Sequence, residues 1–248
     1  VYLQIACDSA YALWLNGKLT AFSGCGDYPW YKLYDCVDIT DGCKDHNDIL
    51  IQVWYIGAPS QTYYVGEPGL LFEIVQDDQV LLASNKDILC RKNDHYQNGY
   101  QKVITGQMGF GFCYDATTKE LPEFTDSTEY PVWENLAART AKPLCLNGRA
   151  KCAVTELADS YLMDMGEETV GLLDLEFYSP IEQKLTICFG EHLVNGQVPR
   201  MIGARDFSVE YVAKAGGNRY INPFRRLAGR YLQVFCEKPL HYSYIGLR

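Results

Sequence analysis

The chain has 248 residues, and its 22 lysines and arginines against 31 aspartates and glutamates give a formal net charge of −9. This length allows one large domain or two modest ones, each with its own core. An acidic chain lacks the basic face that nucleic acids and anionic membranes require, so neither is an expected partner. No apolar stretch approaches the roughly 18–20 residues that span a bilayer.

Ten cysteines stand at irregular spacings, without a C-x-x-C pair or a Cys/His cluster of ligand spacing, which argues against zinc. Four of them lie inside apolar runs, where cysteine is typically a small buried hydrophobe: Cys7, Cys113, Cys188 and Cys236. We therefore expect reduced thiols and a cytoplasmic location. A signal peptide upstream of Val1 would instead place the protein outside the cell.

The first half consists of short runs rich in β-branched and aromatic residues, separated by turn residues. This pattern predicts an antiparallel sandwich or jelly roll. Asn16-Gly17 predicts a type I′ hairpin turn, and Asp77-Asp78 a second hairpin. Asp48–Ile56 is expected to be a central strand. The expected strands are Tyr2–Cys7, Ala12–Leu15, Lys18–Ala21, Lys32–Val37, Asp48–Ile56, Leu70–Val75, Gln79–Ala83 and Gly111–Asp115.

The alternation stops between Ala116 and about Cys145, where a surface connector with a short helix at Val132–Ala138 is expected. Strand-like runs then return to the end of the chain. Val170–Tyr178 and Lys184–Gly190 alternate most regularly and are predicted to form a strand pair joined at Ser179-Pro180. The predicted fold is all-β, with two tandem antiparallel β-sandwich (jelly-roll-like) domains. Their expected bounds are 1–118 and 146–248, with the connector at 119–145.

Motifs that carry catalytic chemistry are missing from the sequence. It has no G-x-S-x-G nucleophile elbow, no phosphate-binding G-x-x-x-x-G-K-[ST] and no dinucleotide-binding G-x-G-x-x-G after a strand. A glycosidase needs two carboxyl groups about 5–10 Å apart, and among 31 acidic residues the sequence singles out no pair. No catalytic residue is therefore assigned.

Asp8 and Trp30 are the candidate substrate-binding residues. Asp8 follows the first strand, and Trp30 ends the turn-rich stretch Ser23–Trp30. A sandwich can hold a sugar with an acidic residue at a strand end and an aromatic residue in a loop, sometimes through Ca²⁺, for which Asp8 is the candidate ligand. The alternative is structural, with Asp8 capping its turn and Trp30 covering the edge of the core.

The second half resembles the β-sandwich that precedes the catalytic barrel in bacterial α-L-rhamnosidases of glycoside hydrolase family 78. The matching segments, in chain order, are Asp164-Met165-Gly166 with Gly171, Phe189-Gly190-Glu191 with Asn195-Gly196, Arg205-Asp206, and Gly229-Arg230-Tyr231. The first half is similar to the N-terminal module of the same family at Tyr11–Lys18 and at Tyr34–Asp41.

In that family, acidic residues on an (α/α)₆ barrel perform an inverting hydrolysis, and this chain lacks the repeated long amphipathic helices of such a barrel. The resemblance implies a non-catalytic N-terminal fragment of an α-L-rhamnosidase, whose partners are its own catalytic domain and rhamnose-containing glycans or glycosides. It also implies that Asp8 and Trp30 match a Ca²⁺-dependent rhamnose-binding module that some members carry. A stand-alone carbohydrate-binding or adhesion module is the alternative, and an enzyme with its site wholly inside the sandwiches is the third hypothesis.

Overall fold

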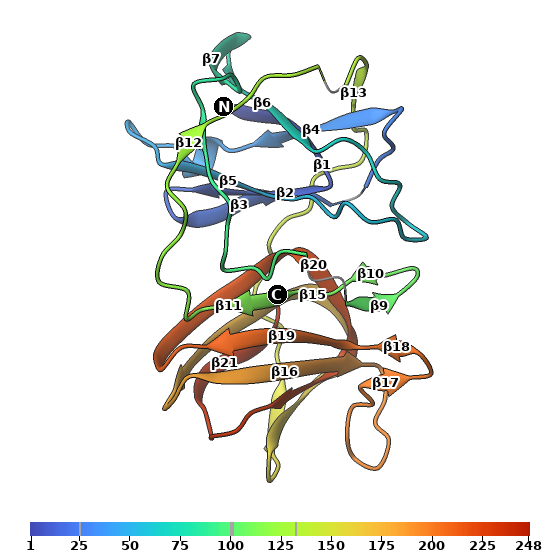
Figure 1. Cartoon of the computed structure of the whole chain (residues 1–248). Coiled ribbons are helices and arrows are strands. Elements are labelled where there is room, and N and C mark those ends of the chain that lie inside the picture. Colours follow the sequence, from blue (N-terminus) through green and yellow to red (C-terminus); the bar gives the residue numbers. More distant parts are fainter. Residues whose placement is uncertain (25, 100–101, 132) are drawn as a thin grey trace. The chain divides into compact units, whose positions relative to one another are not determined.

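The computed structural model describes residues 1–24, 26–99, 102–131 and 133–248, and its regular structure is almost entirely β-strand (Figure 1). The predicted all-β class is confirmed; the helical element of the described residues is a three-residue 3₁₀ turn, Thr40–Gly42. None of the described residues belongs to a helix with the length and hydropathy needed to cross a membrane. Cys25 lies outside the described residues, and the other nine cysteines are free thiols.

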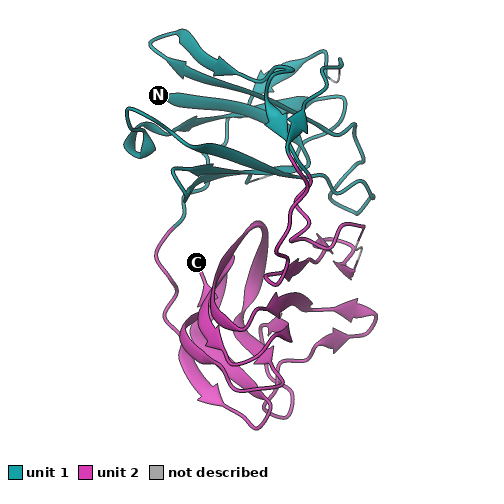
Figure 2. Ribbon diagram, turned by 60° about the vertical axis from the view of Figure 1, so that its left-hand side comes forward, with its two compact units in different colours: residues 1–91, 124–146 teal, residues 92–123, 147–248 magenta. Residues whose placement is uncertain are grey.

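The chain forms two compact units, each built from two separate stretches of sequence (Figure 2). Unit 1 contains Val1–Arg91 and Phe124–Leu146, and unit 2 contains Lys92–Glu123 and Asn147–Arg248. The segment Lys92–Glu123 therefore lies in unit 2. The bounds expected from sequence divide this segment between the first domain (1–118) and the connector (119–145).

Unit 1 has a five-stranded sheet in the order β13-β4-β1-β6-β7 and a three-stranded sheet in the order β3-β2-β5. Alternate residues of β1 and β2, such as Leu3, Ile5 and Leu13, are buried in one core between them. The bounds are β1 (Tyr2–Asp8), β2 (Ala10–Leu15), β3 (Lys18–Phe22), β4 (Lys32–Asp38), β5 (Ile49–Trp54), β6 (Gly69–Gln76), β7 (Gln79–Ala83) and β13 (Leu136–Ala138), with a small ribbon of β8 (Leu89–Cys90) and β12 (Thr125–Asp126).

The hairpin turns of unit 1 have the backbone that their residues predict. Asn16 and Gly17 have φ angles of 52° and 77°, and Asp77 and Asp78 have 49° and 61°. Positive φ at both central residues is the signature of the type I′ turn, which suits the twist of a two-residue hairpin.

Two predictions for unit 1 are wrong. Ile49–Trp54 (β5) lies at the edge of its sheet rather than at its centre, because it pairs with β2 alone among the described strands. Apolar and β-branched content does not distinguish an edge strand from a central one.

The expected helix at Val132–Ala138 is also wrong for its described part. Leu136–Ala138 is a strand that pairs in parallel with Lys32–Tyr34, and Val132 lies outside the described residues. Pairing with β4 here overrides local helix propensity.

Unit 2 is a sheet in the order β11-β19-β16-β20-β15-β14, with β21 also paired to β15. The two longest strands, β15 and β20, have 20 residues each and pair along most of their length, with shifts in register. One continuous buried core joins them. The bounds are β9 (Val103–Thr105), β10 (Gly109–Phe110), β11 (Cys113–Asp115), β14 (Ala153–Glu156), β15 (Ser160–Ser179), β16 (Gln183–Gly190), β17 (Met201–Ile202), β18 (Arg205–Asp206), β19 (Ser208–Ala213), β20 (Gly216–Phe235) and β21 (His241–Leu247).

The strands β15 and β16 follow each other in sequence but are not paired, so the predicted strand pair is wrong. Leu232 of β20 lies between them, opposite Met163 of β15 on one side and Phe189 of β16 on the other. The run predicted to close the first half, Gly111–Asp115, contributes β11 to this sheet, where it pairs in parallel with β19.

The glycines of the family-like motifs allow close approaches between backbones. A Cβ on Gly229, whose φ is 156°, would lie 2.5 Å from the carbonyl oxygen of Gly190. A Cβ on Gly171 would lie 2.7 Å from the carbonyl oxygen of Arg248. These glycines therefore allow the close backbone approaches within the sheet of unit 2.

The acidic and basic residues of the same motifs bind each other. Asp164 accepts hydrogen bonds from Arg230 Nε at 2.7 Å and Nη2 at 2.8 Å, and from the N–H of Gly166 at 2.8 Å. The bonds from Arg230 hold the pKa of the Asp164 carboxyl below its usual range. This bidentate pair fastens β15 to β20 beside the bend at Gly229.

Candidate functional site

Three exposed aromatic rings gather on unit 1, and we call Tyr28, Trp30 and Tyr64 the aromatic cluster. Trp30 is 68% exposed, Tyr64 55% and Tyr28 48%. The rings of Tyr28 and Trp30 are stacked, with centroids 5.1 Å apart and planes 18° apart, and Tyr64 meets Trp30 edge-on at 5.4 Å. Such exposed π faces suit the C–H groups of a sugar ring.

The aromatic cluster stands on two loops, residues 23–31 between β3 and β4 and residues 55–68 between β5 and β6. In the first loop, the N–H of Tyr31 donates to the carbonyl of Tyr28 at 3.1 Å. This bond closes a tight turn with Pro29 at its second position, where the fixed φ of proline is favoured. The turn places Trp30 at its tip, which accounts for the exposure of that side chain.

A buried ion cluster fixes the first loop to β4. The Lys32 side chain is 2% exposed, and its Nζ lies 2.8 Å from Asp27 Oδ1 and 3.9 Å from Asp8 Oδ2. Asp27 also accepts a hydrogen bond from the N–H of Leu33 at 2.9 Å, and the Lys32 ammonium lies 4.8 Å from the ring centroid of Trp133. A lysine buried this deeply is tolerated because two carboxylates compensate its charge.

Asp8 joins the second loop to the first. Its Oδ1 accepts a hydrogen bond from Tyr63 Oη at 2.9 Å. Gly66 packs directly on Asp8 Oδ2, and a Cβ there would also lie 3.3 Å from Pro29 Cγ. Burial, with a smaller effect from the Asp8 charge, raises the pKa of Tyr63 to about 12. The phenol therefore stays protonated and donates to Asp8 at neutral pH.

The two residues selected from sequence thus lie in the same region of unit 1 but differ in their exposure to solvent. Trp30 is open to solvent, whereas Asp8 is 2% exposed and lies beneath the loops that carry the aromatic cluster. Their predicted roles in sugar binding stay predictions. Sequence reasoning missed five residues of the arrangement: Asp27, Tyr28, Lys32, Tyr63 and Tyr64. Two sequence features could have indicated the aromatic cluster: the spacing Tyr28-Pro29-Trp30 and the pair Tyr63-Tyr64. Both lie in loops rich in glycine, proline and polar residues.

The surroundings of Asp8 do not fit Ca²⁺. One carboxylate oxygen accepts the Tyr63 hydroxyl proton, and the other faces the Lys32 ammonium, which is itself a cation. Calcium takes six to eight oxygen ligands in proteins. Among the residues that the structure describes, no group of three or more histidine, cysteine, aspartate or glutamate side chains could hold a metal ion.

We therefore expect the thermal unfolding temperature to be the same in excess Ca²⁺ and in excess EDTA. A site saturated at a hundred times its dissociation constant would add about 2.7 kcal/mol to the free energy of unfolding, which calorimetry detects readily. A rise in the unfolding temperature with Ca²⁺, and not with Mg²⁺, that is lost in Asp8→Asn would contradict this expectation and assign the ion to Asp8.

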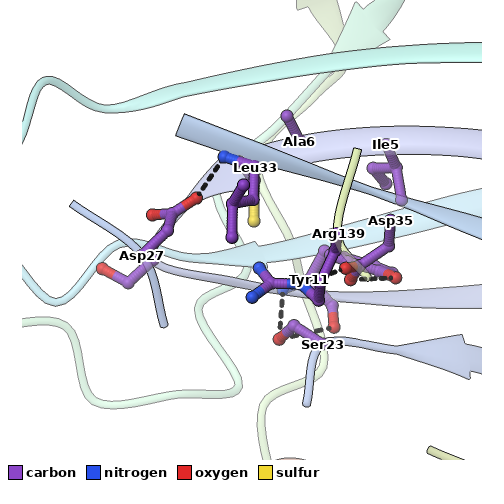
Figure 3. A pocket seen from close by; sticks show the side chains of 10 residues that line it. Ile5, Ala6, Tyr11, Ser23, Asp27, Leu33, Asp35 and Arg139 are labelled. Atoms are coloured by element: carbon purple, nitrogen blue, oxygen red, sulfur yellow. Dashed lines mark hydrogen bonds and ion pairs between the residues drawn. The ribbon is translucent and has the colours of Figure 1, made fainter. Parts of the chain in front are cut away.

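The described part of unit 1 also has a small cavity of about 10 Å³, which has room for about one water molecule. Figure 3 shows Asp35 at this cavity, where it accepts hydrogen bonds from Arg139 Nε and, at 2.9 Å, from Tyr11 Oη. The cavity is too small for a sugar, and its polar groups satisfy each other. It is part of the core and not a ligand site.

The chain matches no protein-family model and no curated protein sequence. Its fold is similar to solved rhamnosidase structures. The match to the GH78 family rhamnosidase of Bacillus sp. GL1 has a TM-score of 0.76 at 13% identity and covers 100% of this chain and 51% of that chain. The match to the Streptomyces avermitilis α-L-rhamnosidase complexed with L-rhamnose has a TM-score of 0.69 at 20% identity and covers 99% and 26%.

A third match, to the α-L-rhamnosidase of Aspergillus terreus, has a TM-score of 0.66 at 18% identity and covers 99% of this chain and 32% of that chain. The present chain thus spans between 26% and 51% of the length of these three structures. The resemblance predicted from sequence is confirmed at the level of the fold, over essentially the whole chain.

Proposed function

We propose that this chain is the non-catalytic N-terminal part of an α-L-rhamnosidase, in which unit 1 contacts sugar and both units support a separate catalytic domain. The observation that carries the proposal is the coverage of the structural matches. The fold accounts for 98–100% of this chain and at most 51% of each rhamnosidase, which leaves the remainder of those chains for other domains. Its partners are then its own catalytic domain and rhamnose-containing glycans or glycosides.

Four carboxyl groups of the two units are poorly suited to act as the acid of a glycosidase. A glycosidase acid needs a carboxyl whose pKa is raised so that it holds a proton at neutral pH. Among the described residues, the carboxyl groups with a shifted pKa are all shifted downward, by hydrogen bonds or by basic neighbours: Asp38, Asp164, Glu176 and Asp206. Buried Asp174 is held by Arg149 through two hydrogen bonds of 3.0 Å.

The activity test uses the 248-residue chain alone with p-nitrophenyl α-L-rhamnoside. We expect no release of p-nitrophenol above the uncatalysed rate, because the proposal places the reacting carboxyl groups on another domain. Release that scales with the concentration of the chain would overturn the non-catalytic assignment and favour a site within the sandwiches.

Sugar binding by unit 1 is supported by the aromatic cluster and by its rigid base. The exposed face of Trp30 offers a surface for a pyranose, and the contacts of Asp8, Asp27 and Lys32 hold both loops in place before a ligand arrives. A loop that is already ordered loses less conformational entropy on binding, so even a small contact area gives measurable affinity.

Replacing Trp30 by alanine is expected to weaken the binding of L-rhamnose by about 10-fold or more, because a tryptophan that a ligand covers can act as a hot spot worth about 2 kcal/mol or more. Isothermal titration calorimetry measures the effect. Tyr31→Ala is the matched control, since Tyr31 is 54% exposed in the same loop but lies outside the aromatic cluster. Equal affinity in the wild type and Trp30→Ala would remove the aromatic cluster from the binding site.

A stand-alone carbohydrate-binding or adhesion module is the second candidate, and the aromatic cluster favours it, because such a surface needs no catalytic domain. The reading frame beyond the codon for Arg248 distinguishes the two candidates. Several hundred residues with repeated amphipathic helices are expected for the rhamnosidase, and an immediate stop codon for the module.

A further inference from the structure

Unit 2 carries an open hollow of about 330 Å³ on one face of its sheet. This volume lies at the lower end of the range of about 300–1,000 Å³ that is typical of small-molecule sites. The residues that line it come from β15, β20 and β21: Glu176, Phe177, Tyr178, Gly217, Asn218, Arg219, His241 and Ser243.

The register of the three strands explains the hollow. Tyr178 of β15 stands opposite Gly217 of β20 on one side and His241 of β21 on the other. Phe177 and Asn218 point to the buried side, whereas Tyr178 and Gly217 are exposed. Because glycine has no side chain, one flank of the Tyr178 ring stays uncovered.

The groups around the hollow combine an aromatic face with donors and an acceptor. Tyr178 is 52% exposed, and its ring centroid lies 6.3 Å from that of His241. Glu176 lines the hollow and accepts a hydrogen bond of 2.6 Å from Arg149 Nη2 at one carboxylate oxygen. A carboxylate has two acceptor oxygens, so it can also accept from a ligand. Within the described part of the chain, Arg219 makes no hydrogen bond or ion pair, so its guanidinium can donate to a ligand.

The charges at the hollow balance. Among the side chains that line it, Glu176 carries one negative charge and Arg219 one positive charge. An acidic ligand would be repelled by Glu176 and a cationic ligand by Arg219. A neutral ligand with many hydroxyl groups can instead accept from Arg219 and donate to Glu176 at the same time.

We propose that this hollow is a second carbohydrate site, which binds one neutral pyranose ring against Tyr178 with its hydroxyl groups bonded to Arg219 and Glu176. The site belongs to unit 2 alone and uses no residue of the aromatic cluster. It therefore stands whether or not Trp30 binds sugar, although it extends the proposed role of the chain as a sugar-contacting part of a glycosidase.

The test fills the hollow without disturbing the fold. A Cβ on Gly217 meets no atom within 4 Å, and the φ of this residue lies outside the left-handed region, so the backbone accepts a side chain here. Gly217→Leu places that side chain on the strand position opposite Tyr178. Val170→Leu is the control, because Val170 is 62% exposed on the same strand as Tyr178 and does not line the hollow. Trp30→Ala is the common background and removes the aromatic cluster of unit 1 from the measurement.

Isotope-labelled protein is titrated with L-rhamnose while backbone amide NMR signals are followed. We expect the amides of Gly217, Arg219 and His241 to shift in the Trp30→Ala background. The affinity is expected to be at least about tenfold lower after adding Gly217→Leu or Arg219→Gln and unchanged after adding Val170→Leu. No shift at these amides, or equal affinity with Gly217→Leu, would overturn the site. Tighter binding of D-galacturonate than of L-rhamnose would overturn its preference for a neutral sugar.

Discussion

Replacing Lys32 by methionine lowers the free energy of unfolding of unit 1 by about 3–5 kcal/mol, the usual cost of removing one partner of a buried ion pair. Methionine keeps the apolar stem but leaves the carboxylates of Asp8 and Asp27 without their shared cation. All four tryptophans of the chain, at positions 14, 30, 54 and 133, belong to unit 1. Urea denaturation followed by tryptophan fluorescence therefore reports this unit selectively.

Lys18→Met is the matched control, because Lys18 is exposed at the start of β3 and its substitution is expected to change stability by less than about 0.5 kcal/mol. Adding Asp8→Asn and Asp27→Asn to Lys32→Met should recover part of the loss, since the buried charges then disappear together. A change in Lys32→Met no larger than in Lys18→Met would contradict a structural role for the ion cluster.

Replacing Gly229 by alanine destabilises unit 2 by about 3 kcal/mol or more. The new methyl group would lie 2.5 Å from the carbonyl oxygen of Gly190 and 2.9 Å from its nitrogen, and backbone atoms in two paired strands cannot yield as a flexible side chain does. Overpacking of this kind commonly costs about 1–3 kcal/mol, and an unfavourable φ adds about 1–3 kcal/mol.

Far-UV circular dichroism during urea denaturation measures this change, because strands of both units contribute to that signal. Gly148→Ala is the control, as its Cβ meets nothing within 4 Å. The tryptophan fluorescence transition should stay in place in Gly229→Ala, since unit 2 has no tryptophan. A Gly229→Ala protein as stable as Gly148→Ala would show that the two backbones can separate without cost.

The strands and hairpins of this protein were predictable because their determinants are local. The period-2 alternation in β15 and the Asn16-Gly17 turn lie within a few residues of sequence. The order of the strands was not predictable. Leu232 separates two strands that a short turn at Ser179-Pro180 brings close in sequence, and only the buried core that β15, β16 and β20 share requires this order.

Of the candidate site, the sequence singled out Trp30 and Asp8 but not the residues around them. Trp30 could be chosen because an aromatic residue at the end of a turn-rich stretch is unusual. Nothing in the sequence indicated that Lys32 is buried, because lysine is rarely buried and its ion-pair partners are known only from the three-dimensional structure. Tyr63, the hydrogen-bond partner of Asp8, is 55 residues away in sequence.

The chain passes between the two units after Arg91, after Glu123 and after Leu146. Strands β12 and β13 pair with β8 and β4 of unit 1, and β11 pairs with β19 of unit 2. A single proteolytic cut at any of these passages therefore leaves two fragments that share a sheet and stay associated until they are denatured. For the same reason, any continuous piece of the gene that encodes one unit in full also encodes part of the other.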